Sequence, residues 1–175
     1  MAGTIYELDP VSSITTGYIG QPGKRVFYLQ ATRGDQTVTL VVEKMQVDVL
    51  AQSIQQFLAE LKEQFPDLPE ASFNYRPENM NLRVPLDPAF RVGQLGLGYD
   101  SDRDLILLVA QEVTTEERTD DEASVARLFA TRAQMLTLAE HGKSIIKQGR
   151  PICTFCGQPV DPEGHFCPRR NGHKY

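Results

Sequence analysis

The spacing of apolar residues changes from a strand period to a helix period at two places in this chain. After the strand-like stretch 37–42, apolar residues recur at intervals of three and four until Pro66: Leu50, Ile54, Phe57, Leu58, Leu61 and Phe65. This spacing predicts an amphipathic helix with one buried stripe, because one turn takes 3.6 residues. The same change follows the stretch 125–130, where Thr131 is a suitable N-cap for a helix from Arg132 to about Gln148. The chain therefore predicts an α+β fold.

Further strands are predicted before each helix. Pro22 and Gly23 form a turn between stretches rich in β-forming residues, which indicates a hairpin over residues 17–31. Before the second helix, Phe90–Tyr99 and Leu105–Val113 are apolar and separated by the turn-forming residues 100–103. Each helix is thus expected to follow three strands.

The two runs also agree in detail. An offset of 88 residues separates Gln46 from Gln134 and Leu50 from Leu138. We predict a duplicated βββα unit, covering residues 14–65 and 89–148. The two units are expected to form one antiparallel sheet with two helices on one face. A chance likeness between two strand-to-helix transitions is the alternative.

All three cysteines of the chain lie near its C-terminus, at Cys153, Cys156 and Cys167. Cys-x-x-Cys followed by glycine is typical of a metal knuckle, and thiolates are preferred ligands of structural zinc. A closed tetrahedral site needs a fourth donor, for which His165 is nearest and His173 is the alternative. We predict a structural Zn²⁺ site in a small C-terminal zinc knuckle.

A boundary is expected where Gly149 to Pro151 interrupts the second helix. The residues that follow are too few to fold alone, so metal binding would supply most of their folding free energy. The predicted domains are an α+β body over residues 1–148 and a zinc-binding module over residues 149–175.

Composition narrows the functional classes. A net charge of −5 argues against a body that binds nucleic acid by bulk electrostatics. Three clustered cysteines fit a reduced, cytoplasmic protein better than a disulfide framework. The N-terminus lacks the pattern of a signal peptide, and no apolar run has the length to span a bilayer, so no membrane association is expected.

Other candidate sites are weaker. The glycines between Gly93 and Gly98 do not match a phosphate-binding loop, and they predict a bulge or a close packing contact. His141 is expected to face solvent or to cap its neighbour. Lys44 and Arg132 stand at the starts of the two helices, and two adjacent helix N-termini could form an anion-binding groove. Ordinary capping is the alternative for both residues.

The start Ile5–Pro10, the segments Arg25–Gln30 and Phe90–Gly93, and the C-terminal cysteine signature resemble an uncharacterised bacterial family. That family is the domain of unknown function numbered thirty-ninety. The resemblance implies no activity. The family pattern carries tyrosine where this chain has His173, which favours His165 as the fourth ligand.

We therefore expect an adaptor protein, whose body is a platform and whose zinc module docks a partner protein or nucleic acid. Arg169 and Arg170, in the basic tail, are the candidate contact residues, because planar guanidinium groups suit phosphate and carboxylate partners. The alternative is an enzyme that acts on a phosphorylated small molecule in a groove between the two repeats. The oligomeric state is not predicted.

Overall fold

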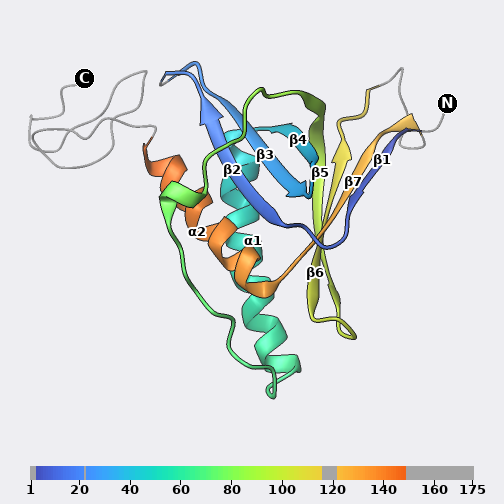
Figure 1. Cartoon of the computed structure of the whole chain (residues 1–175), viewed down its shortest axis with the longest axis vertical. Helices are drawn as coiled ribbons and strands as arrows, with labels where there is room; N and C mark the ends of the chain where they lie inside the picture. The colour runs from blue at the N-terminus through green and yellow to red at the C-terminus, as the bar shows by residue number, and fades with distance from the viewer. Residues whose placement is uncertain (1–2, 22, 116–121, 149–175) are drawn as a thin grey trace, which may run out of the picture.

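The computed structural model describes residues 3–21, 23–115 and 122–148 (Figure 1). Its first half contains β2 (Ser13–Ile19), β3 (Val26–Arg33), β4 (Gln36–Val42) and α1 (Lys44–Gln64). Its second half contains β5 (Pro88–Asp100), β6 (Leu105–Glu112), β7 (Val125–Ala130) and α2 (Arg132–Gln148). The predicted order of strands and helices is confirmed, and the fold class is α+β. The structure adds β1 (Ile5–Leu8) and a short 3₁₀ helix, η1 (Pro77–Asn79).

The seven strands of the described residues form one mixed sheet in the order β1-β7-β6-β5-β4-β3-β2. The prediction of a purely antiparallel sheet is wrong at two places, because β4 pairs with β5 in parallel and β1 pairs with β7 in parallel. The first parallel pair has a physical reason. The connection from β4 to β5 contains the whole of α1, and a crossover helix returns the chain to the same end of the sheet. The duplication of the βββα unit stays a prediction.

The sheet curls until its two edges approach each other. β1 and β2 stand at opposite ends of the strand order, yet only residues 9–12 connect them (Figure 1). Hydrogen bonds tie this link to both sides, from Val11 N–H to Phe129 O at 2.7 Å and from Ser12 N–H to Thr32 O at 2.6 Å. The chain thus pairs first with β7 through β1 and then, after the link, with β3 through β2.

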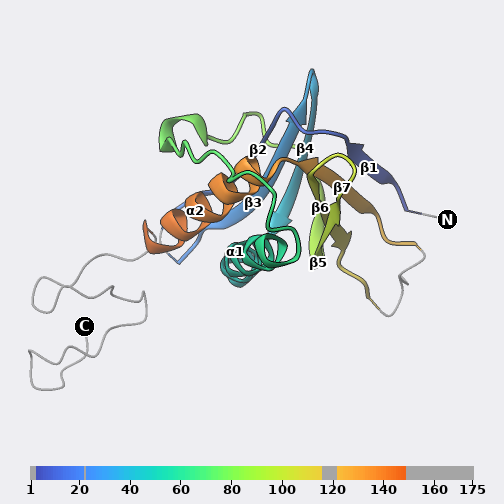
Figure 2. The same ribbon diagram turned by 90° about the horizontal axis from the view of Figure 1, so that it is seen from below.

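The two helices pack antiparallel on the same side of the sheet (Figure 2). Their contact is close at Gly142, where an added Cβ would lie 3.3 Å from the side chain of Val47 and 3.7 Å from Ala51. In the predicted stripe of α1, Leu50, Ile54 and Leu61 are buried and Phe57 and Leu58 are partly buried against the core. The prediction is wrong for Phe65, which is 39% exposed at the end of the helix. The core joins both helices to the sheet, and its largest fully buried side chains include Leu29, Leu40, Leu108, Leu128 and Met135.

The connection between α1 and β5, residues 65–87, is closely packed along its course. It first passes α2, where the Tyr75 hydroxyl lies 2.9 Å from His141 Nδ1. It then crosses to β2, where Thr15 Oγ1 donates to the carbonyl of Met80 at 2.7 Å. Further along, Gln30 exchanges two hydrogen bonds with the backbone of Arg83. Residues 72–83 therefore cover the place where α2 meets β2, and we call them the covering segment.

Candidate functional site

A groove with a volume of about 450 Å³ lies between α1 and β5. Its lining is mostly apolar, with Met45, Val49 and Phe57 on α1 and Leu95 and Leu97 on β5. Met45 and Val49 are 75% and 54% exposed, although both stand on a helix that packs on the core. Exposed apolar side chains that line a groove are typical of a binding surface. We call this feature the α1–β5 groove.

The groove is open because β5 loses one of its two partners. β4 pairs with β5 only as far as Val41 opposite Arg91, whereas β6 pairs with β5 to its end. From Gly93 onward, the other side of β5 therefore faces α1 with no paired strand among the described residues. Gly93 itself lies at an irregularity in the pairing with β6, and a Cβ there would be 2.8 Å from Val113 Cα. The predicted bulge and close contact are both confirmed at this glycine.

One end of the groove is held by the cap of α1. The side-chain carbonyl of Gln46 accepts a hydrogen bond from the Glu43 N–H at 2.7 Å, as the third helical residue does in a capping box. The amide nitrogen of the same side chain donates to Val92 O at 3.0 Å. One glutamine thus caps the helix and fixes its start against β5.

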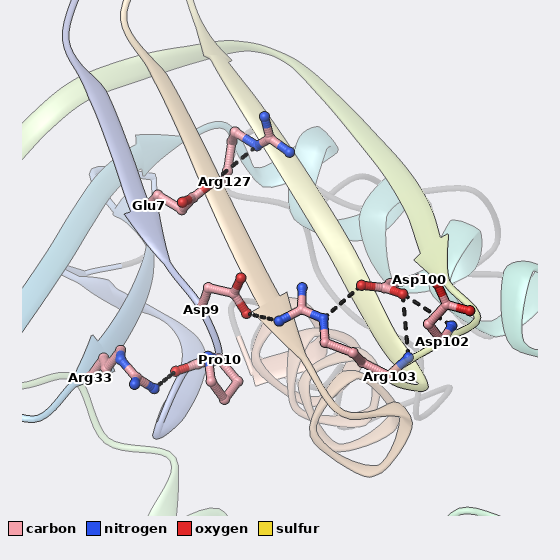
Figure 3. Close-up of polar contacts among 8 residues, drawn as sticks. All are labelled: Glu7, Asp9, Pro10, Arg33, Asp100, Asp102, Arg103 and Arg127. Carbon is pink, nitrogen blue, oxygen red and sulfur yellow. Dashed lines mark hydrogen bonds and ion pairs between the residues drawn. The ribbon is translucent and has the colours of Figure 1, made fainter.

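A cluster of charged residues lies at the end of the sheet where β1 passes into β2 (Figure 3). Arg103 donates to Asp9 Oδ1 at 2.8 Å and to Asp100 Oδ2 at 2.7 Å. Its guanidinium lies 5.0 Å from the ring centroid of Phe129. The hydrogen bond from Arg103 holds the pKa of Asp100 below its usual range. The β5–β6 hairpin is thereby tied to the β1–β2 link.

A second ion pair adjoins this cluster. Arg132 donates from Nε and Nη2 to the two carboxylate oxygens of Asp104, at 2.8 and 2.9 Å. Asp104 also accepts a hydrogen bond from the Tyr99 hydroxyl at 2.7 Å. The bond from Arg132 lowers the pKa of Asp104, while burial and the bond to Asp104 raise the pKa of Tyr99 to about 12.

These shifts decide what the charged residues can do chemically. A general acid or base works best when its pKa lies near the operating pH. Each shift here stabilises the protonation state that the group already has at neutral pH, so the cluster acts as a clamp. It joins the tip of the β5–β6 hairpin to the start of α2 and, through Arg132 and the carbonyl of Pro69 at 2.8 Å, to the connection after α1.

The structure does not bring Lys44 and Arg132 together. The helices are antiparallel, so Lys44 begins α1 beside the C-terminal half of α2, whereas Arg132 begins α2 beside Leu61 and Lys62 of α1. The predicted N-cap Thr131 is confirmed, since its Oγ1 accepts a hydrogen bond from the Gln134 N–H at 3.0 Å. The two helix N-termini therefore form no shared anion-binding groove.

The expectation that His141 faces solvent or caps its neighbour is wrong, because only 8% of this residue is exposed. Its ring bonds to the Tyr75 hydroxyl and donates to the backbone of Thr16. Burial lowers the pKa of His141, which keeps the ring neutral at neutral pH. The reason for the error is the covering segment, whose path over α2 cannot be read from a helical pattern.

The predicted metal ligands Cys153, Cys156, His165 and Cys167 lie outside the described residues, as do Arg169 and Arg170. Within residues 3–148, apart from the gaps, no group of three or more His, Cys, Asp or Glu side chains could hold a metal ion. The same part of the chain contains no helix long and apolar enough to cross a membrane.

A family model, described as a protein of unknown function (DUF3090), matches residues 6–167. The chain belongs to this family. Searches of curated proteins and of solved structures each gave no match. Within this DUF3090 chain the match includes both helices and all strands except Ile5, the first residue of β1.

Sequence reasoning missed the α1–β5 groove. Its signal was present, because Met45 and Val49 are apolar residues outside the predicted stripe of α1. Their environment depends on where β4 leaves β5, which is a property of the sheet.

Proposed function

We propose that this protein is an adaptor that binds a partner through its body and holds zinc in its C-terminal residues. The observation that carries the proposal is the α1–β5 groove, an open and largely apolar surface on two regular elements. Binding sites of this kind combine an apolar lining with a few polar groups, here Gln46, Ser53 and Gln56. The reduced thiols that zinc binding requires fit a cytoplasmic location.

The zinc part of the proposal concerns Cys153, Cys156, Cys167 and His165. The family match includes all four and ends before His173, which supports His165 as the fourth ligand. Elemental analysis of protein purified without chelator should give close to one equivalent of zinc. Cys156→Ser and His165→Ala should lose the metal, whereas His173→Ala should keep it. Protein without zinc, or loss with His173→Ala alone, would contradict this ligand set.

Charge supports a partner contact by the tail. Residues 1–148 carry 21 acidic and 14 basic side chains, whereas residues 149–175 carry 2 acidic and 4 basic ones. Arg169 and Arg170 would meet a phosphate or an acidic protein surface, so either a protein or a nucleic acid fits the tail. The double alanine variant should bind the partner more weakly, the binding should weaken with salt, and zinc content should stay unchanged.

The groove has its own test. A crosslinked partner captured by the wild-type chain should be lost with Val49→Glu, which puts a charge among the apolar lining residues. Gln52→Glu is the matched control, because it adds the same charge to the same helix outside the groove lining. Equal capture by both variants would remove the groove from the adaptor function.

We also infer that the two βββα runs are copies of one unit, and two kinds of observation give support: matching glutamine contacts and matching rows across the sheet. Gln134 accepts from the Thr131 N–H at 2.9 Å and donates to Ser12 O at 3.3 Å, as Gln46 does with Glu43 and Val92. Leu29, Leu40 and Phe90 are neighbours across β3, β4 and β5, and the corresponding row is Leu108, Leu128 and Leu8. In this correspondence, β1 matches the first part of β5, which pairs with β4, and β2 matches the later part of β5, which pairs with β6.

Phosphate chemistry between the helix starts receives no support from the described geometry, because Lys44 and Arg132 lie at opposite ends of the helix pair.

A further inference from the structure

The α1–β5 groove has a counterpart between α2 and β2, which we call the α2–β2 groove. Its helical lining residues Ala133, Gln134 and Thr137 stand 88 positions after Met45, Gln46 and Val49, which line the α1–β5 groove. The facing side is lined by Ser13 and Ile14 of β2 and by Ser12, which precedes that strand. The two grooves are therefore built at corresponding places, each by a helix start and a strand that lies beside it.

The α2–β2 groove is already occupied by this chain. Ser72, Asn74 and Met80 of the covering segment contribute to its lining, and the space left is about 230 Å³. Two hydrogen bonds hold the segment there, from Tyr75 to His141 and from Thr15 to the carbonyl of Met80. Met80 is the apolar anchor, with only 7% of the residue exposed. Apart from η1, the segment has no helix or strand of its own.

The same kind of occupant fits the open groove. A strand edge without a partner accepts a further extended chain through its backbone groups, and the side chains of that chain then enter neighbouring pockets. β5 offers such an edge from Gly93 onward, beside the apolar side chains of Met45 and Val49. An extended segment would therefore find backbone partners on one wall and apolar contacts on the other.

Charge narrows the occupant further. Glu60 is the one charged side chain in the lining of the α1–β5 groove, and Glu63, three positions further along α1, is also exposed. A basic side chain in the bound segment would complement these carboxylates.

We propose that the α1–β5 groove binds an extended peptide segment of a partner protein, with apolar side chains toward α1 and a basic residue near Glu60. This inference rests on the adaptor function proposed above and specifies its partner chemistry. The covering segment is the model for the ligand, because it contains no strand and only the short helix η1, is anchored by the apolar Met80 and carries Arg76 and Arg83.

The probe is a fluorescein-labelled peptide with the sequence of residues 71–84 of this chain, titrated against the full-length protein and followed by fluorescence anisotropy. We expect saturable binding that Val49→Glu weakens about tenfold, the size of effect expected at a central apolar contact. Ser53→Phe should weaken it similarly by filling the groove without adding charge. Gln52→Glu is the control that should bind like the wild type, and Glu60→Gln should weaken binding about twofold and reduce its salt dependence.

Each other outcome overturns the inference. Absence of binding, or equal binding by a peptide with serine in place of Met80 and Leu82, would exclude the extended apolar ligand. Binding that survives both Val49→Glu and Ser53→Phe would mean that the peptide displaces the covering segment from the α2–β2 groove. Thermal melts of each variant establish that it folds.

The results distinguish failure of the peptide inference from failure of the proposed adaptor function. If the peptide does not bind but capture of the partner still depends on Val49, the adaptor function stands and the peptide mode fails. If the peptide binds but capture is insensitive to Val49→Glu, the groove recognises peptides and the partner is held elsewhere.

Discussion

The α1–β5 and α2–β2 grooves are assembled from the same parts but completed differently. In both, a glutamine caps the helix and donates to a carbonyl of the sheet side, Val92 on β5 for Gln46 and Ser12 just before β2 for Gln134. In one, Met80 and Tyr75 cover the junction and bury His141; in the other, Met45 and Val49 stay exposed. The difference teaches that the cap fixes the position of a helix, whereas the connection that follows decides whether the junction belongs to the core or to the surface.

The strongest test of this comparison truncates the covered methionine and the exposed methionine in two separate variants. Met80→Ala should lower the free energy of unfolding by about 2–4 kcal/mol, because it leaves a cavity under the covering segment. Met45→Ala should change it by less than about 0.5 kcal/mol, since that side chain is 75% exposed. Urea denaturation measures both. Equal effects would show that the two junctions do not differ in the way described.

The clamp at the start of α2 should come next in size. Arg132→Ala removes two bonds to Asp104 and one to Pro69, and we expect a loss of about 2 kcal/mol. Because Arg132 holds the pKa of Asp104 down in the folded state, this contribution is present above pH 4 and is lost as the pH falls through the folded pKa. Denaturation at pH 7 and pH 3 should therefore show a smaller difference between variant and wild type at the lower pH.

His141 gives the covered groove a pH dependence of its own. Its pKa is lowered by burial, so the unfolded chain binds a proton that the folded chain does not. The contribution of His141 to the free energy of unfolding should be fully present above pH 6.5. It should fall as the pH drops below this value, by no more than about 1.4 kcal/mol per pH unit. Comparing His141→Gln with the wild type across this range isolates the effect. If the free energy of unfolding of the variant depends on pH as that of the wild type does, His141 is not the source of this pH dependence.

The smallest losses of stability should come from removing the two helix caps, and the two losses should be similar in size. Gln46→Ala removes a capping bond and a bond to β5, and Gln134→Ala removes a capping bond and a bond to Ser12 before β2. We expect a loss of about 1 kcal/mol for each. Thermal unfolding of the two variants measures the pair. A much larger loss at one site would weaken the correspondence between the two runs.

Much of the fold could be predicted from local patterns. The stripe of α1, the cap at Thr131 and the turn after β5 are each encoded within one or two turns of chain, so short-range sterics and amphipathicity suffice to identify them. β1 was missed because four residues with one buried position carry little periodicity. The predicted zinc ligands remain predictions, since they lie outside the described residues.

The sequence by itself determined the order of the strands and helices and the residues that cap and bury them, because these depend on neighbours three or four positions away. The tertiary structure alone decided that β4 meets β5 in parallel, that β1 and β2 close the curled sheet, and that one groove is covered while the other stays open. Such choices depend on contacts between residues far apart in the chain, such as Tyr75 with His141, and their free energy is gained only when the whole sheet is assembled.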